Sequence, residues 1–312
     1  MADAAAFFQS CTHAGALLGS LCAILIVPPA VWLIVRYAKP RILAMDADRC
    51  WQAPFAAVGS LLPGASFLSI AAYGLTVGTS SNCLQFITGR IIFAALLFLT
   101  ALALARAIWI AAVRLGEAAS IRRSSCDAGE RLKAAAPATC AVREIADANP
   151  FCAVLGILHP VIVLSTGALD RLDDEELSAA LSHEIAHIRR FDHVLGALAA
   201  FFSDLLPFAG DDLLKTYWEA REFAADQRAI TQTKVEALAG AIIAMAKPPR
   251  LGLAALDGGT VIARLQCLLT PSAQSVSARG RMIAGSTLGV ATMIALFPFA
   301  AGALGFLSCH LQ

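Results

Sequence analysis

The sequence predicts a mainly α-helical membrane protein. It should have four transmembrane helices and a cytoplasmic, mostly helical domain with a small β-element, inserted between the third and fourth helices. Of its 312 residues, 58% are hydrophobic and only 15% are charged, whereas soluble domains carry about 25% charged residues. The mean hydropathy is +0.69. Four apolar runs are long enough to cross a bilayer, and the basic residues gather on one side of them.

The four apolar runs each exceed the roughly 20 residues that a membrane helix needs. They lie near Ala14–Val35, Phe55–Thr79, Ile91–Val113 and Met282–Leu307. Prolines in the first and last runs do not exclude helices, because neighbouring helices can satisfy the freed carbonyls. The N-terminus lacks the basic region of a signal peptide, so the first run is expected to be retained.

The distribution of Lys and Arg predicts the orientation. Basic residues follow the first run, follow or close the third and precede the fourth, whereas the link "VGTSSNCLQ" between the second and third has none. The predicted units are therefore a membrane region of residues 1–114, a cytoplasmic domain of residues 115–281, and a fourth helix with a short external tail, residues 282–312. Both termini should lie outside. Arg106, inside the third run, is expected to extend its side chain to the inner headgroups.

Charge and cysteine content set further limits. The net charge is only +1 and no basic patch with aromatic residues stands out, so direct nucleic-acid binding is not expected. The topology places Cys11, Cys83 and Cys309 outside, where a pair of them could form a disulfide. The cysteines of the cytoplasmic segment should be free thiols.

The segment "LSHEIAHIRRFDH", residues 181–193, has the strongest chemical pattern. In a helix, His183 and His187 lie on one face, one turn apart. Two such imidazoles can bind zinc, and Glu184 lies close enough to act on a bound water. The alternative is a surface helix with incidental histidines.

The surrounding pattern favours this helix. Asp173 and Asp174 can cap its N-terminus, and an apolar stripe including Leu177 and Leu181 lies opposite the histidines. Short β-type runs precede it between residues 140 and 165. The apolar stretch Val194–Leu206 is too short to span a bilayer, so it should pack in the core or against the membrane.

Two kinds of residue compete as the third metal ligand. His193 would require the chain to turn back at a glycine, but Arg190 stands there and the pattern continues as helix. In "WEAREFAAD", Glu222 and Asp226 are four residues apart and face the same way. Glu222 could complete the metal site, and Asp226 could accept the outer N–H of a ligand histidine. Glu219, one turn earlier, could replace Glu222.

The segments "LDRLDDEELSAALSHEIAHIRRFDH" and "EAREFAADQRA" resemble the BlaR–MecR family of integral-membrane zinc peptidases, whose zinc domain is of the gluzincin type. The resemblance covers residues 140–270. It implies one Zn²⁺ per chain bound by His183, His187 and Glu222, with Glu184 as the general base and Asp226 as a hydrogen-bond partner behind a ligand. It also implies a zinc domain between the third and fourth membrane helices, in the cytoplasmic (inner) membrane of a bacterium.

The implied function is a regulatory endopeptidase that acts on a polypeptide, namely a cytoplasmic transcriptional repressor or the chain itself. The antibiotic sensors of the family carry an external penicillin-binding domain, whereas this chain ends at Gln312 and no Ser stands three residues before a Lys. β-Lactam sensing by that route is therefore not expected.

Several points stay open at this level. The β-run near Val161–Leu164 could align a substrate by edge addition, and Tyr217 or Arg228 could stabilise the oxyanion. A housekeeping zinc protease for membrane-protein quality control is one alternative, and a non-catalytic zinc-binding signalling scaffold is another. The scaffold is disfavoured because a structural site needs no base such as Glu184. The oligomeric state is also open.

Overall fold

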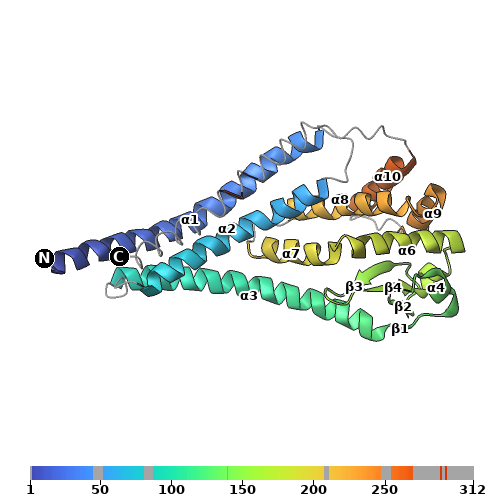
Figure 1. The fold of residues 1–312 in the computed structure, drawn as a ribbon, viewed down its shortest axis with the longest axis horizontal. Coiled ribbons are helices and arrows are strands. Elements are labelled where there is room, and N and C mark those ends of the chain that lie inside the picture. Colours follow the sequence, from blue (N-terminus) through green and yellow to red (C-terminus); the bar gives the residue numbers. More distant parts are fainter. Residues whose placement is uncertain are drawn as a thin grey trace.

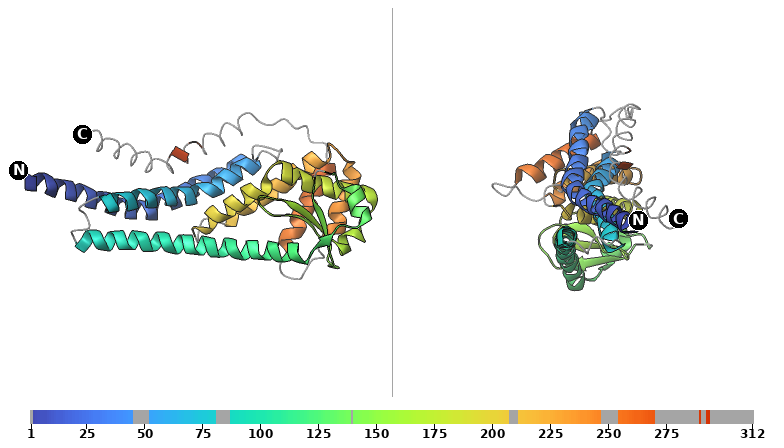
Figure 2. Two further views of the ribbon diagram at one scale, coloured as in Figure 1. Left: turned by 60° about the horizontal axis from the view of Figure 1, so that its bottom comes forward. Right: turned by 90° about the vertical axis from the view of Figure 1, so that its left-hand side faces the viewer.

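The computed structural model describes residues 2–44, 52–80, 87–138, 140–206, 211–246 and 254–269, together with residues 289 and 292–293. The molecule is elongated, with three long helices extending from one side of a compact mixed domain (Figures 1 and 2). These helices are α1 (Ala2–Ala44), α2 (Gln52–Ser80) and α3 (Ile87–Ser124).

Three described helices contain segments long and apolar enough to cross a membrane: Ala16–Tyr37, Phe55–Val77 and Ile87–Ser124. They correspond to the first three predicted runs. The fourth predicted run lies outside the described residues except for residues 289 and 292–293, as do Cys83 and Cys309. The fourth span and the disulfide therefore stay predictions.

The third helix is longer than its apolar run. α3 continues beyond Val113 to Ser124, so the polar segment after the third apolar run begins as helix. The two-residue strand β1 (Cys126–Asp127) and the short helix α4 (Glu130–Ala135) follow. α3 therefore connects the membrane region directly with the compact domain (Figure 2).

The compact domain contains a four-stranded sheet in the order β1-β2-β4-β3, formed with β2 (Val142–Ile145), β3 (Cys152–Leu155) and β4 (Val161–Ser165). β2 and β4 are parallel, whereas β1 with β2 and β3 with β4 are antiparallel.

Every residue of β4 is buried, because a continuous apolar run suits a strand covered on both faces. The prediction that Val161–Leu164 offers a free edge is therefore wrong. The edge strand next to β4 is β3, which borders a cavity at Cys152.

Six helices complete the described domain: α5 (Thr166–Leu169), α6 (Asp174–Arg189), α7 (Asp192–Asp204), α8 (Asp211–Ala229), α9 (Val235–Met245) and α10 (Ala254–Leu269). The predicted start of α6 is confirmed. The Asp173 side chain accepts from the Glu176 N–H, and the Glu176 carboxylate accepts from the Asp173 N–H. The apolar stripe of α6 packs with β4 in one core cluster, which turns the opposite face of α6 towards α8.

The continuous helix predicted beyond Arg190 is wrong. α6 ends at Arg189, and Phe191 adopts a left-handed conformation (φ 57°) before α7 begins. A non-glycine residue in this region is disfavoured by about 1–2 kcal/mol. Asp192, directly after the turn, is buried, and its carboxylate lies 2.9 Å from His187 Nδ1.

The apolar stretch Val194–Leu206 packs against the membrane helices. Phe201, Phe202, Leu205 and Leu206 share an apolar cluster with residues of α1, α2 and α3, and α7 lies between α2 and α3 (Figure 1).

Arg106 has a protein partner that the sequence pattern did not indicate. Its exposed side chain donates to the main-chain carbonyl of Asp204, at the end of α7, and its position relative to the headgroups stays a prediction. The carbonyls in the last turn of a helix commonly accept from side chains, because the helix itself offers them no N–H donor.

Candidate metal centre

Helix α6 presents two histidines to α8. His183 and His187 are one turn apart on the face opposite the core stripe, and both are buried. Their Nε2 atoms lie 3.1 Å apart. The helical period alone explains this arrangement, because residues i and i+4 project in the same direction.

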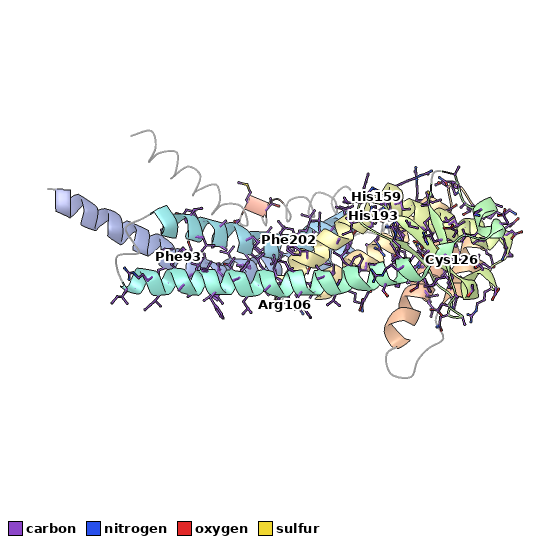
Figure 3. All side chains as sticks on the ribbon, turned by 90° about the horizontal axis from the view of Figure 1, so that it is seen from below. Phe93, Arg106, Cys126, His159, His193 and Phe202 are labelled. Carbon is purple, nitrogen blue, oxygen red and sulfur yellow. The ribbon has the colours of Figure 1, made fainter. Side chains whose placement is uncertain are left out.

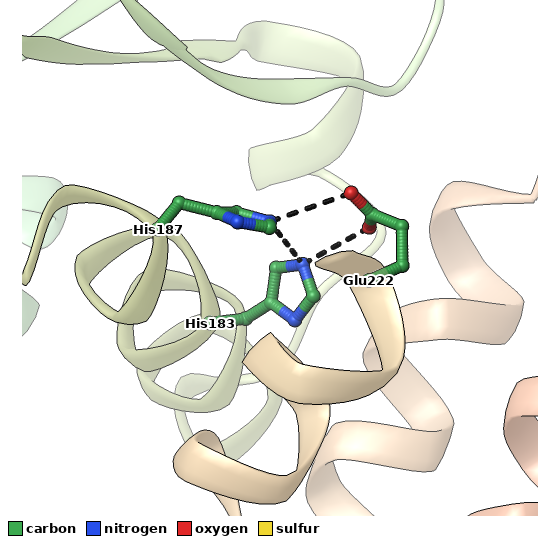
Figure 4. A group of neighbouring side chains, drawn as sticks. All are labelled: His183, His187 and Glu222. Atoms are coloured by element: carbon green, nitrogen blue, oxygen red, sulfur yellow. Dashed lines mark hydrogen bonds and ion pairs between the residues drawn. The ribbon is translucent and has the colours of Figure 1, made fainter. Parts of the chain in front are cut away.

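Glu222 on α8 faces both imidazoles (Figure 4). Its Oε2 atom is 3.3 Å from His183 Nε2, and its Oε1 atom is 3.4 Å from His187 Nε2. One donor atom from each of the three residues lies within 4.8 Å of the others. Two imidazole nitrogens and a carboxylate are the donor set of many catalytic zinc sites, which leave a fourth position open. These residues therefore fit a zinc ion.

Each histidine is held from behind by a carboxylate. His183 Nδ1 lies 2.9 Å from Asp226 Oδ1, and His187 Nδ1 lies 2.9 Å from Asp192 Oδ2. A carboxylate at Nδ1 keeps the proton there and leaves the Nε2 lone pair for a metal. Asp226 was predicted for this position. Asp192 was missed because the sequence pattern hides the turn at Phe191.

The carboxylates make the centre strongly favourable for positive charge. Burial by itself lowers the pKa of His183, but hydrogen bonding to Asp226 and Glu222 outweighs burial and raises that pKa to about 10. Burial raises the pKa of Glu222, but the two histidines hold it well below its ordinary value. A metal ion bound at this centre would take the place of the protons that the carboxylates favour on the histidines.

Replacing Asp192 by asparagine is expected to weaken zinc binding by about 10–100-fold, as is usual for a partner behind a ligand histidine. The amide keeps the shape of the side chain but loses the charge that fixes the imidazole. Chelator competition on the purified full chain measures the effect. The matched control is Asp174→Asn, since the Asp174 carboxylate is 86% exposed and pairs with Arg131. Equal affinities for the two variants would contradict this role of Asp192.

Glu184 lies beside the histidines in a cavity of about 480 Å³. The cavity is bounded by the β3 end of the sheet at Phe151 and Cys152, by α6, by α8, and by apolar residues of α9. Burial raises the pKa of Glu184, although both histidines act in the opposite direction. A raised carboxyl pKa suits a residue that must exchange protons near neutral pH.

The competing ligand candidates are not part of the three-residue group among the described residues. Glu219 lines the outer part of the cavity, where its carboxylate is 4.0 Å from Lys215 Nζ. His193 lies beyond the turn, with its ring 6.3 Å from that of Phe191. Figure 3 labels it at the membrane-facing side of the compact domain. His193 was rejected as a ligand on the expectation of a continuous helix, and that expectation was wrong. The turn at Phe191 nevertheless brings Asp192, and not His193, to the two histidines.

Neither Tyr217 nor Arg228 lines the cavity. Tyr217 is buried against α7 and donates to the carbonyl of Asp192 at 3.4 Å, and Arg228 is on the exposed side of α8. Among the described residues, two cations line the cavity: Lys215 of α8 and Arg264 of α10.

Arg264 contacts two of the acidic residues of α8, Asp226 and Glu222. Its Nε and Nη2 atoms bind the Asp226 carboxylate at 2.7 and 2.6 Å, and its Nη1 atom is 3.3 Å from Glu222 Oε2. Such a two-pronged contact fixes both position and orientation. Arg264 therefore positions the carboxylate that faces the histidines.

Replacing Arg264 by glutamine is expected to lower the free energy of unfolding by about 3–5 kcal/mol, because it removes the cation that is paired with the buried Asp226 carboxylate. Denaturant titration of the detergent-solubilised chain measures this change. The control is Lys234→Gln, which removes an exposed ion pair with Glu175 and should leave the unfolding transition in place. A stable Arg264→Gln chain would show that Asp226 is satisfied without it.

A helix with two histidines and a buried glutamate, faced by a second helix with a further glutamate, is the arrangement of a metallopeptidase site. The comparison with protein families agrees. The family model described as BlaR1 peptidase M56 matches residues 69–237, more than half of the chain, and the chain belongs to this peptidase family.

Curated proteins with similar segments are protease HtpX homologues. Those of Dictyoglomus thermophilum, Sulfurovum sp. and Thermoanaerobacter pseudethanolicus are 38%, 35% and 30% identical over 61, 52 and 77 residues. These segments cover 20%, 17% and 25% of this chain and 20%, 19% and 26% of the relatives. The similarity thus spans about a quarter or less of each relative. No solved structure matches.

Proposed function

We propose that the protein is a membrane-embedded zinc-dependent endopeptidase with a regulatory role, which cleaves a cytoplasmic transcriptional repressor, itself, or both. Membership of a peptidase family supports the peptidase activity. The observation that carries the proposal is the convergence of His183, His187 and Glu222 beside the buried Glu184 in one open cavity.

In this proposal, His183 and His187 hold one zinc ion through Nε2, and Glu222 holds it through its carboxylate. A bound zinc ion supplies Lewis acidity, which activates water and polarises the scissile carbonyl. Glu184 accepts a proton from the attacking water as the oxygen adds to the carbonyl carbon. It then delivers this proton to the amine nitrogen as the C–N bond breaks, so that one water is consumed per bond.

The substrate is proposed to bind in an extended form along β3. One edge of β3 pairs with β4, and within the described part of the chain no strand pairs with the other edge. Cys152, the first residue of β3, and Phe151 before it line the cavity together with Glu184. An exposed strand edge offers main-chain N–H and C=O groups to a peptide regardless of its sequence.

The topology belongs to the same proposal. The zinc domain, residues 115–281, is placed in the cytoplasm between the third and fourth membrane helices, with both termini outside, in the inner membrane of a bacterium. The three apolar helices support membrane insertion, and the distribution of basic residues supports the orientation.

A housekeeping protease that degrades membrane proteins is the second candidate function. It is favoured by the similarity to proteases named HtpX homologues. The site chemistry is the same in both cases, so the substrates distinguish them. A regulatory protease should have one or a few substrates, and a housekeeping protease should have many.

The test compares cells that express the wild-type chain with cells that express Glu184→Gln, by quantitative mass spectrometry of protein N-termini. The regulatory proposal expects one or a few new N-termini in the wild type, within a DNA-binding protein or within the chain itself. Many new N-termini across membrane proteins would favour the housekeeping role. No difference between the two strains would contradict a peptidase.

A further inference from the structure

Helix α7 connects the metal centre with the membrane helices. Its first residue, Asp192, is 2% exposed and holds His187 at Nδ1. Its last residue, Asp204, is also buried and lies twelve residues later. At about 1.5 Å per residue, the two carboxylates are separated by about 18 Å of helix. One helix therefore ends at the hydrogen-bond partner of His187 on one side and among the membrane helices on the other.

Helix α3 holds the membrane end of α7 with two arginines. Arg106 donates from Nη1 to the main-chain carbonyl of Asp204, and Arg114 pairs through Nη1 with the Asp204 carboxylate. Arg114 Nη2 lies 3.4 Å from the second carboxylate oxygen. The last carbonyls of a helix lack helical partners and form the negative end of its dipole, so both guanidinium groups are well placed.

Helix α2 holds the same end from another side. A Cβ atom at Gly64 would lie 2.3 Å from the carbonyl oxygen of Phe202, so the two backbones are in direct contact. Phe67 and Ile70 of α2 also share an apolar cluster with Leu205. Figure 3 shows Phe202 and Arg106 at the same level of the helix bundle. The end of α7 is thus wedged between α2 and α3, and a shift of one against the other must displace it.

The simplest alternative is that the arginines only satisfy polar groups in an apolar bundle, where unpaired charges are costly. One donor would be enough to cap the helix. Here α3 commits two arginines eight residues apart to one residue, and the opposite end of the same helix positions a histidine of the metal centre. Capping the end of α7 does not require its other end to hold a histidine of the metal centre.

We propose that Arg106, Arg114 and Asp204, the α3–α7 clamp, transmit the arrangement of the membrane helices through α7 and Asp192 to His187. The clamp residues are positioning residues, which set how tightly the centre binds its metal and thereby its activity. The inference rests on the proposed metal centre but does not depend on which substrate is cleaved.

A double-mutant cycle tests the clamp. The full chain in lipid nanodiscs carries Glu184→Gln, which prevents self-cleavage, with Asp204→Asn, Asp192→Asn, both or neither. Zinc affinity is measured by chelator competition, and the visible spectrum of Co²⁺ bound at the same centre reports the ligand geometry. Asp204→Asn alone is expected to weaken zinc binding by about fivefold or more, the usual range of coupling between distant sites, and to change the Co²⁺ spectrum.

The two substitutions should not be additive, because Asp192→Asn already removes the connection to His187. Sites more than about 10 Å apart normally show additive effects, so additivity would overturn the proposal. A lower thermal unfolding midpoint with unchanged zinc affinity would also overturn it and leave a structural cap. If Asp204→Asn does not fold, Arg114→Gln removes the side-chain pair while Arg106 still caps the helix, and the same outcomes apply.

Asp174→Asn is the matched control and should change neither affinity nor spectrum. The clamp and the peptidase proposal fail in different ways. A chain that binds zinc with the expected coupling but never cleaves a polypeptide would contradict the proposed function alone. A peptidase whose zinc affinity ignores Asp204 would contradict the clamp alone.

Discussion

Replacing Glu184 by glutamine is expected to lower kcat by about 10²–10⁴-fold, the usual contribution of a general base, while bound zinc stays at the wild-type level. Glutamine has nearly the same shape but cannot accept a proton. Glu184 is not one of the three grouped donors, so the metal should be retained. Because its side chain is buried in the cavity wall, bulk water cannot easily replace its function.

The measurement combines the cleavage rate of a peptide substrate with the zinc content of the same preparation. Glu175→Gln is the matched control on the same helix, since its exposed carboxylate pairs with Lys234 at the surface. This control should keep both activity and metal. If Glu184→Gln kept more than a tenth of the wild-type rate, another group would have to accept the proton and the mechanism proposed here would be wrong.

The parts of the structure that were predictable depend on local periodicity. Three membrane helices follow from uninterrupted apolar runs. The positions of His183 and His187 on one face, and of Glu222 and Asp226 on another, follow from the four-residue spacing of a helix. The start of α6 follows from the capping pair Asp173 and Glu176. Each of these features is determined within about one or two helical turns.

Features that depend on tertiary contacts were not predictable. No glycine or asparagine marks the left-handed turn at Phe191, so nothing in the local pattern places Asp192 behind His187. Arg264 lies 38 residues after Asp226 and reaches it only because α10 folds back over α8. Arg106 finds Asp204 98 residues further along the chain. In each case a charged side chain is matched to a partner that local pattern cannot identify.

The role of β4 is a different case, because its sequence did contain the information. A run of four apolar residues from Val161 to Leu164 is typical of a strand buried on both faces. In the structure this strand, β4, lies between β2 and β3. The edge next to the cavity belongs to β3, whose residues are only partly buried. Burial pattern therefore predicts which strand is internal better than proximity to the zinc helix does.

Replacing Glu222 by alanine is expected to abolish stoichiometric zinc binding. The substitution removes one of three ligands, an effect that should exceed the 10–100-fold loss caused by an outer partner. It also leaves two cations facing the centre, because Arg221 Nη2 and Arg264 Nη1 lie 3.1 and 3.3 Å from the Glu222 carboxylate. Without the Glu222 carboxylate, the positive charge of these two guanidinium groups would oppose a divalent ion in the same space.

Zinc content of the purified chain, measured by mass spectrometry, decides between Glu222 and its neighbour. Glu219→Ala is the matched control, one turn earlier on α8, with a carboxylate 42% exposed beside Lys215. It should retain one zinc per chain, as should Glu184→Gln. Unchanged zinc in Glu222→Ala, or loss of zinc in Glu219→Ala, would break this ligand set. The pairing of Glu222 with both imidazoles would then have to be an ion pair that a bound metal rearranges.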